Sequence, residues 1–124
     1  MTSNYRRGSD FERKVMDVLR QRGFLCVRSA GSRSPVDVVA WNPAVTLLVQ
    51  CKADGRMRAA DRARLLAWAQ DGMALLPVLA AKAGRGTVEF IAIAEDAARD
   101  TVIDLENPTW LCERKECRHR TPND

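Results

Sequence analysis

The amino-acid sequence has no hydrophobic run long enough to form a transmembrane helix. Its longest apolar stretch, from Met73 to Ala81, is interrupted by Pro77, whereas a membrane-spanning helix needs about 20 predominantly apolar residues. The first ten residues also lack the apolar segment of a secretory signal peptide. We therefore expect a protein of the cytoplasm, or of the host cytoplasm if the source is viral, with no membrane partner.

Cysteine and histidine are too few and too scattered to indicate a disulfide framework. The four cysteines form no C-x-x-C pair, and without an export signal we expect them to be reduced thiols. A zinc site at Cys112, Cys117 and His119 is the alternative, but the spacing is not that of common zinc fingers and a fourth ligand is missing. His119 lies in a charged tail, where solvation is a simpler role than general base.

The chain is long enough for one domain with its own hydrophobic core, at 124 residues. We expect the folded domain to span residues 1–100. Beyond it the secondary-structure signal fades and the sequence becomes polar, so residues 101–124 are expected to form a partly disordered C-terminal extension with at most a short strand over 101–105.

Charge is distributed unevenly along the chain. Residues 1–34 carry eight Lys and Arg against three Asp and Glu, whereas residues 89–106 carry one Arg against six acidic residues. Such polarity can steer a polyanion such as a nucleic acid onto one face of a protein. A solvated surface of uneven charge is the alternative.

Hydrophobic periodicity predicts an α/β fold, with a mixed sheet flanked by helices in the order α-β-β-β-α-β-β. Ser9 and Glu12 have the spacing of a capping box at the start of the first helix, and Gly23 ends it. The remaining elements are strands over 24–28, 36–41 and 45–52, a helix over 59–70, and strands over 75–82 and 87–94.

Two details of this pattern carry structural expectations. Asn42-Pro43-Ala44 is a turn signal that joins two strands into a hairpin, and Pro77 restricts its strand to a sheet edge or a strand start. Trp41 and Trp68 are expected in the core.

The hairpin register brings three polar side chains together. If Pro43 and Ala44 are the two turn residues, Asp37 lies directly opposite Gln50. Lys52 points to the same side as Gln50, because side chains alternate along a strand.

These groups suit a hard cation. Asp37, Gln50 and the backbone carbonyl of Cys51 offer the oxygen ligands that Mg²⁺ prefers, and Glu12, at the margin of the apolar stripe of the first helix, can add another. Lys52 beside such a metal could activate water or balance charge during phosphodiester hydrolysis. A strand-end ion pair between Asp37 and Lys52 is the structural alternative.

The ordered motifs resemble a known nuclease family. Pro35-Val36-Asp37 followed by Gln50-Cys51-Lys52 resembles the bipartite motif of the PD-(D/E)xK nuclease superfamily. Within it, the chain resembles the archaeal-type Holliday junction resolvases. The similarity covers about residues 5–94 and includes the segments 5–8, 12–13, 27–32 and 75–80.

The resemblance implies a restriction-endonuclease-like fold and a homodimeric, structure-selective endonuclease that cuts four-way DNA junctions by paired nicks. It implies Mg²⁺, with Mn²⁺ able to substitute, held by Asp37 and Gln50, with Glu12 completing the site and Lys52 as the catalytic lysine. The residues expected to contact DNA are Arg6, Arg7, Arg13, Arg28, Ser32 and Arg33.

One residue departs from the family pattern. The family usually has an acidic residue where Gln50 stands, and the neutral amide removes a negative charge from the metal site. Related Mrr-type restriction nucleases have glutamine there, so catalysis is compatible with it. An Mrr-like nuclease acting on duplex DNA and a non-catalytic DNA-binding module are the alternative functions.

Overall fold

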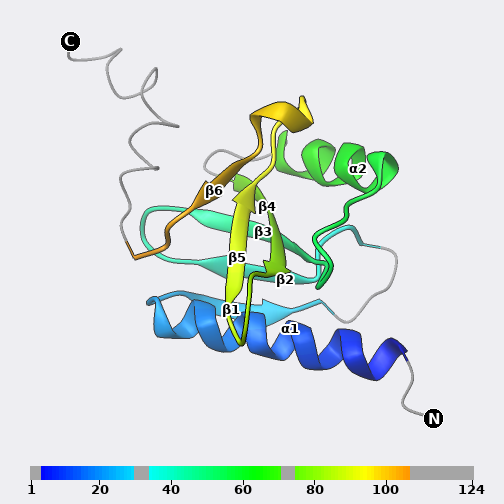
Figure 1. Ribbon diagram of the computed structural model, residues 1–124. Coiled ribbons are helices and arrows are strands. Elements are labelled where there is room, and N and C mark those ends of the chain that lie inside the picture. The colour runs from blue at the N-terminus through cyan, green and yellow to red at the C-terminus, as the bar shows by residue number, and fades with distance from the viewer. Residues whose placement is uncertain (1–3, 30–33, 71–74, 107–124) are drawn as a thin grey trace.

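The computed structural model describes residues 4–29, 34–70 and 75–106, with side chains from Gly8 onward. The predicted order of elements is confirmed, the short strand expected over 101–105 is present as a sixth strand, and a 3₁₀ helix precedes it (Figure 1). The elements are α1 (Asn4–Gln21), β1 (Leu25–Arg28), β2 (Val38–Trp41), β3 (Thr46–Cys51), α2 (Ala59–Gln70), β4 (Leu75–Lys82), β5 (Val88–Ala92), η1 (Ala97–Arg99) and β6 (Thr101–Ile103). No helix of these described segments is both long and apolar enough to cross a membrane.

The two helices cover opposite faces of one six-stranded sheet (Figure 1). Apolar residues of α1, including Val15 and Leu19, pack on one face and form the larger core. Leu65 of α2 packs on the other face against Leu48 and Leu79. The fold is therefore α/β with three layers, as the sequence predicted.

The strands lie in the order β1-β2-β3-β4-β5-β6. Neighbouring strands are antiparallel except β3 and β4, which are parallel and connected through α2. A parallel pair needs such a crossover because its connection must return to the starting end of the sheet. The C-terminal end of β3 and the N-terminal end of β2 consequently lie at the same end of the sheet.

Pro77 does not place its strand at an edge, and that part of the expectation was wrong. β4 is paired on both sides, although Pro77 is only its third residue. The Pro77 carbonyl accepts a 2.9 Å hydrogen bond from the N–H of Ile93, which lies just past the last residue of β5. Proline has no backbone N–H to donate. At Pro77 this missing donor falls where the pairing of β4 with β5 ends, so few hydrogen bonds between the strands are lost.

The first helix also begins earlier than expected. It starts at Asn4, so Ser9 is a buried residue inside the helix and the predicted capping box does not mark its start. A serine cap contributes only about 1 kcal/mol, which does not prevent a helix from continuing through such a residue. The expected end is confirmed, since Gly23 has φ +88° and donates to the Arg20 carbonyl.

The sheet continues past the domain boundary expected at residue 100. β6 pairs with β5 through Phe90 and Ile103, and Leu105 packs against the larger core. Residues 107–124, with Cys112, Cys117 and His119, lie outside the described residues.

A clamp connects this last part of the chain to α2. Arg62 donates two hydrogen bonds to the carboxylate of Asp100, at 2.8 and 2.7 Å, and one of 3.0 Å to the carbonyl of Ala94. Asp100 in turn accepts from the N–H of Ala94.

Candidate active site

The β2–β3 hairpin has the register that the sequence predicted. The pairs run from Val38 opposite Val49 to Trp41 opposite Thr46. The Asn42 side chain fixes the turn by accepting hydrogen bonds from the backbone N–H groups of Ala44 and Val45. These local bonds explain why an Asn-Pro signal was sufficient to predict the pairing.

Regular pairing stops before Asp37, and the expected direct pairing of Asp37 with Gln50 was wrong. Val36 packs in the α2 core while Val38 packs in the α1 core, so the strand alternation is interrupted between them. The N–H of Asp37 donates instead to the carbonyl of Val49, over 2.8 Å. This local irregularity turns the Asp37 carboxylate toward the end of β3.

Three hydrogen bonds hold Asp37 in place. Besides the bond to Val49, its carbonyl accepts from the N–H of Ser29 over 2.8 Å. Its side-chain Oδ2 accepts from the N–H of Cys51 over 2.8 Å. Asp37 thus links the ends of β1, β2 and β3, and its second carboxylate oxygen is the one available as a ligand atom.

The Glu12 side chain of α1 lies at the same end of the sheet as Asp37. Its Oε1 accepts a 2.7 Å hydrogen bond from Nε of Arg28, at the end of β1. Both side chains are partly buried. The expectation that Glu12 borders the core is confirmed, and Arg28 is placed to orient it.

The charges around Asp37 are coupled. Burial raises the pKa of Asp37; the Cys51 N–H opposes this rise, and the negative charge of Glu12 adds to it. The positive charges of Lys52 and Arg28 act to lower the same pKa. Two carboxylates and two cations therefore meet at one end of the sheet.

Gln50 and Cys51 point to opposite faces of the sheet. Alternation along β3 places Gln50 on the side of Leu48, and it is only 6% exposed. Its Oε1 is buried without a hydrogen-bond partner among the described residues. Buried polar atoms without partners are rare in proteins, and an unseen ion is one established reason for them.

Cys51 contributes through its backbone rather than its thiol. The side chain packs against the α1 core. Burial raises the pKa of the thiol, and the negative charges of Asp37 and Glu12 raise it further. Both effects favour the protonated thiol over the thiolate.

Lys52 follows β3 in a segment that is fixed at both ends. Its N–H donates to the Ala80 carbonyl over 2.9 Å, and its carbonyl accepts from the N–H of Gly55 over 2.8 Å. Gly55 has φ +74°, a conformation that favours glycine. The backbone of Lys52 is thereby held beside Asp37.

The described side chains do not provide a complete set of metal ligands. Among the described residues, no three His, Cys, Asp or Glu side chains are grouped so that they could hold a metal ion. The carboxylates of Glu12 and Asp37 and the unpartnered amide oxygen of Gln50 are oxygen donors. They fit Mg²⁺, which is commonly held by one or two carboxylates and keeps several of its waters.

A groove with three arginines borders this site on the β1 side of α1. We call it the arginine groove; it has a volume of about 330 Å³ and is lined by Arg13, Met16, Asp17, Arg20 and Arg28. Two of the predicted DNA-binding residues, Arg13 and Arg28, lie here together with Arg20, which was not among the residues predicted from the sequence. Arg6 and Arg7 fall within α1, but their side chains, like Ser32 and Arg33, lie outside what the structure describes.

Comparison with known proteins identifies the family of this chain. The profile described as "Archaeal holliday junction resolvase (hjc)" matches residues 3–111. The chain belongs to the archaeal Holliday junction resolvase family. The family membership that the sequence motifs suggested is thus confirmed.

Two relatives show the extent of the likeness. A protein of Methanocaldococcus jannaschii named crossover junction endodeoxyribonuclease Hjc is 38% identical over 58 residues, which are 47% of this chain and 43% of that protein. The matched segment therefore spans less than half of that relative. The structure of Archaeoglobus fulgidus Hjc, a Holliday junction resolvase from an archaeal hyperthermophile, superposes with a TM-score of 0.62 at 26% identity, over 78% of this chain and 88% of that one.

Proposed function

We propose that this protein is a metal-dependent endonuclease that cuts four-way DNA junctions by paired phosphodiester hydrolysis. The observation that carries the proposal is the meeting of Glu12, Asp37 and Lys52 at the end of β3, in a member of the resolvase family. Such a reaction on cellular or viral DNA would take place in the cytoplasm.

The metal in this proposal is Mg²⁺, with Mn²⁺ as a substitute. The residues that would hold it are Asp37, Gln50, Glu12 and the backbone carbonyl of Cys51. A divalent ion supplies Lewis-acid activation of the phosphate and a more acidic water. The mutual repulsion of Glu12 and Asp37 and the unpartnered Gln50 oxygen are both features that a cation would relieve.

The side chains of the protein have separate roles in the reaction. Lys52 would orient the attacking water or balance charge on the phosphate. Arg28 holds the Glu12 carboxylate and borders the arginine groove. Arg13 and Arg20 would contact backbone phosphates, while the branched shape of the junction, rather than base sequence, provides selectivity.

A homodimer supplies the two nicks. One chain carries one such site, and a two-fold axis would relate two identical sites on a symmetric junction. The sheet face on the α2 side has apolar residues left in solvent: Leu25 is 64% exposed and Val27 is 52% exposed. Trp68 of α2 is 50% exposed, contrary to the core position expected for it.

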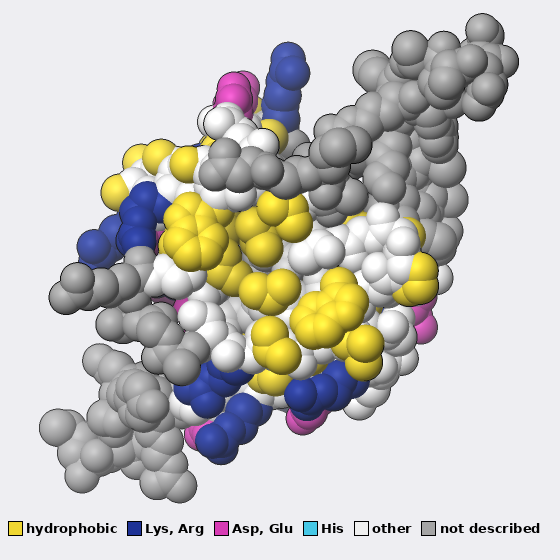
Figure 2. All heavy atoms as spheres, turned by 180° about the vertical axis from the view of Figure 1, so that it is seen from behind, with side chains coloured by type: hydrophobic (Ala, Val, Ile, Leu, Met, Phe, Trp, Pro, Cys, Tyr) yellow, Lys and Arg dark blue, Asp and Glu magenta, His cyan; other side chains and the backbone are white. Residues whose placement is uncertain are grey.

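These residues indicate where the second copy packs. Figure 2 shows hydrophobic side chains gathered on this side of the molecule, bordered by Lys and Arg side chains. Exposed apolar groups of this extent are typical of interaction sites. We assign the α2 face, including Leu25, Val27 and Trp68, to the dimer interface.

Cleavage of a synthetic four-way junction tests the proposal. With Mg²⁺ we expect paired, symmetric nicks on the junction and no cutting of a linear duplex of the same sequence. Asp37→Asn should bind the junction as tightly as the unchanged protein but cut at least 100-fold more slowly, as for loss of a group that acts in the transition state.

The two alternative functions predict different cleavage products. Equal cutting of the linear duplex would favour an Mrr-like nuclease. Junction binding without cutting at any Mg²⁺ or Mn²⁺ concentration would favour a non-catalytic binding module, for which the neutral Gln50 is the supporting observation.

A further inference from the structure

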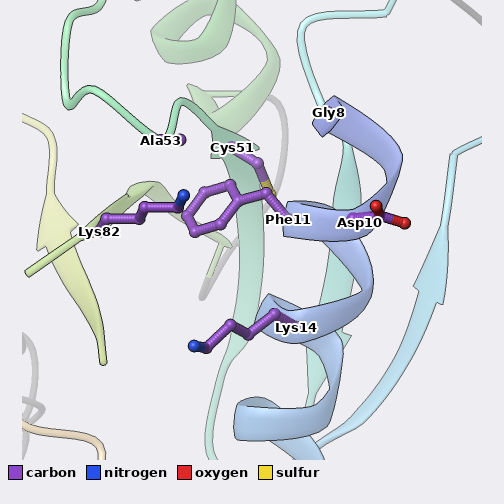
Figure 3. Close-up of a pocket in the computed structure, with 7 residues that line it drawn as sticks. All are labelled: Gly8, Asp10, Phe11, Lys14, Cys51, Ala53 and Lys82. Atoms are coloured by element: carbon purple, nitrogen blue, oxygen red, sulfur yellow. The ribbon is translucent and has the colours of Figure 1, made fainter. Parts of the chain in front are cut away.

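A second pocket lies on the other side of α1 from the arginine groove. We call it the lysine pocket; its volume is about 470 Å³ and its walls come from the N-terminal half of α1 and the ends of β3 and β4. Phe11, which is buried, and Cys51 contribute apolar wall, and Lys14 and Lys82 contribute positive charge (Figure 3).

The charge of the pocket is set by its two lysines. In Figure 3 the amines of Lys14 and Lys82 lie on one side of α1, and the carboxylate of Asp10 points away from both. Neither lysine forms an ion pair with another residue in the described segments. Lysine amines that no carboxylate neutralises suit a phosphate, which they bind as point charges.

The lysines are held in place by the fold. Lys82 ends β4, and its N–H donates a 3.1 Å hydrogen bond to the carbonyl of Ala53. Nζ of Lys14 lies 3.5 Å from the position that a Cβ would take on Gly86, so it rests against the turn between β4 and β5. The pocket is thus built from three elements that the sheet fixes together.

The pocket adjoins the candidate active site through one residue. The Cys51 side chain lines the pocket, while its N–H donates to the carboxylate of Asp37. Ala53, also in the lining, follows Lys52 directly. A phosphate in the pocket would therefore lie beside the backbone segment that carries the catalytic lysine.

The two basic sites are on opposite flanks of one helix. Helical rotation of about 100° per residue separates Lys14 from Arg20, with the core-facing stripe between them. The arginine groove includes Arg28 of β1, and the lysine pocket includes Lys82 of β4, so the sheet order also separates them. A helix with its side chains is about 10–12 Å across, similar to the width of about 12 Å of the DNA major groove.

We propose that the lysine pocket binds a backbone phosphate of the DNA, so that the protein holds sugar-phosphate backbone on both sides of α1. The inference rests on the proposed function, because it takes DNA as the ligand. It assigns Lys14 and Lys82 as positioning residues, which hold the substrate without touching the reacting atoms.

The salt dependence of junction binding tests this assignment. Binding of a four-way junction is measured in EDTA between 50 and 200 mM salt for Lys14→Ala, Lys82→Ala, the double variant and the unchanged protein. Each lost phosphate contact should reduce the slope of log K against log salt by about 1, so the double variant should lose about 2. The single-turnover rate of cleavage at saturating protein should be unchanged, while the protein concentration that gives half of this rate should rise.

Two further variants separate charge from structure. Arg99→Ala removes an exposed cation from η1, remote from α1, and should leave the slope unchanged. Lys82→Arg should keep the slope of the unchanged protein. Because Lys82 is an exposed strand end, Lys82→Ala should keep the melting temperature even if Lys14→Ala does not.

The outcomes distinguish this inference from the proposed function. Lysine variants with the same slope as Arg99→Ala would overturn the inference, while junction cutting by the unchanged protein would still stand. Failure of the unchanged protein to bind DNA in a salt-dependent way would overturn the proposed function itself.

Discussion

Nε of Arg28 lies 2.7 Å from Oε1 of Glu12, so a residue expected to contact DNA is bound to a residue expected to contact metal. The pair joins the end of β1 to α1 directly beside Asp37. Arg28 therefore has two roles in the proposed enzyme, one in positioning a carboxylate and one in the arginine groove.

Arg28→Lys separates these two roles. The lysine keeps the positive charge but lacks the planar guanidinium that donates from Nε. We expect junction binding within about twofold of the unchanged protein and single-turnover cleavage slower by roughly 10- to 100-fold, because a small displacement of a catalytic group is costly. Arg20→Lys, in the same groove but without contact to Glu12, is the control; equal rates for both variants would contradict the positioning role.

Gln50→Glu restores an acidic residue to a buried position. In EDTA the added carboxylate would be buried without a partner, and we expect a loss of about 1–3 kcal/mol in the free energy of unfolding. Added Mg²⁺ should recover this loss, since an ion that binds only the folded state stabilises it. Melting temperatures with and without Mg²⁺ measure both effects.

The same variant should also cut junctions at lower metal concentration. We expect half-maximal cleavage at roughly tenfold less Mg²⁺, because the site gains one negative charge. A Gln50→Glu protein whose melting temperature does not respond to Mg²⁺ would show that Gln50 is not a ligand. Gln50→Leu, which removes the oxygen and keeps the burial, is the matched control.

Arg62 and Asp100 make stability depend on acid pH. Burial opposes ionisation of Asp100, but the hydrogen bonds from Arg62 and Ala94 outweigh it and lower the pKa of Asp100. A carboxylate with a lowered pKa stabilises the fold above its unfolded value of about 3.9, and this contribution is lost as pH falls through the folded-state value.

Asp100→Asn measures the contribution of this clamp. At pH 7 we expect the free energy of unfolding to fall by about 1–3 kcal/mol, as for a charge-assisted hydrogen bond. The difference from the unchanged protein should shrink as the pH is lowered below about 4. Denaturant unfolding at pH 7 and pH 3 provides the comparison, and a difference that is independent of pH would rule out the ionic contribution.

A negative charge introduced into the proposed interface should dissociate the proposed dimer. Val27→Glu places a carboxylate on the apolar α2 face, and we expect the dimer dissociation constant to rise at least 100-fold. Thr101→Glu is the control, since Thr101 is exposed at the opposite edge of the sheet and pairs with Ala92 of the α1-side core. Sedimentation velocity compares the two. A Val27→Glu protein that remains dimeric would place the interface elsewhere.

Local chemistry explains what could be predicted from the sequence. The hairpin register followed from Asn42 and strand alternation, and the helix over 59–70 followed from periodicity. These features depend on residues close together in the chain. The sequence predicted Asp37 beside the end of β3 through a regular pair with Gln50, whereas a break in the strand alternation directs its carboxylate to the N–H of Cys51.

Tertiary context explains what could not be predicted. Pro77 is tolerated inside the sheet because the neighbouring strand ends beside it. Trp68 is exposed because it lies outside the stripe of α2 residues, Leu65, Leu66 and Ala69, that packs on the sheet. The lysine pocket joins Lys14 and Lys82, which no sequence pattern connects. Such features depend on contacts between elements that are far apart in the chain.

β3 carries residues of the proposed active site and also residues of both hydrophobic cores. Its successive residues contribute to both cores, and Gln50 and Cys51 belong to opposite layers. A strand packed on both sides has little room for changes of side-chain volume. Exchange of glutamine and glutamate preserves size, so if Gln50 is a metal ligand as proposed, the charge of the site can change at this position while the three layers remain intact.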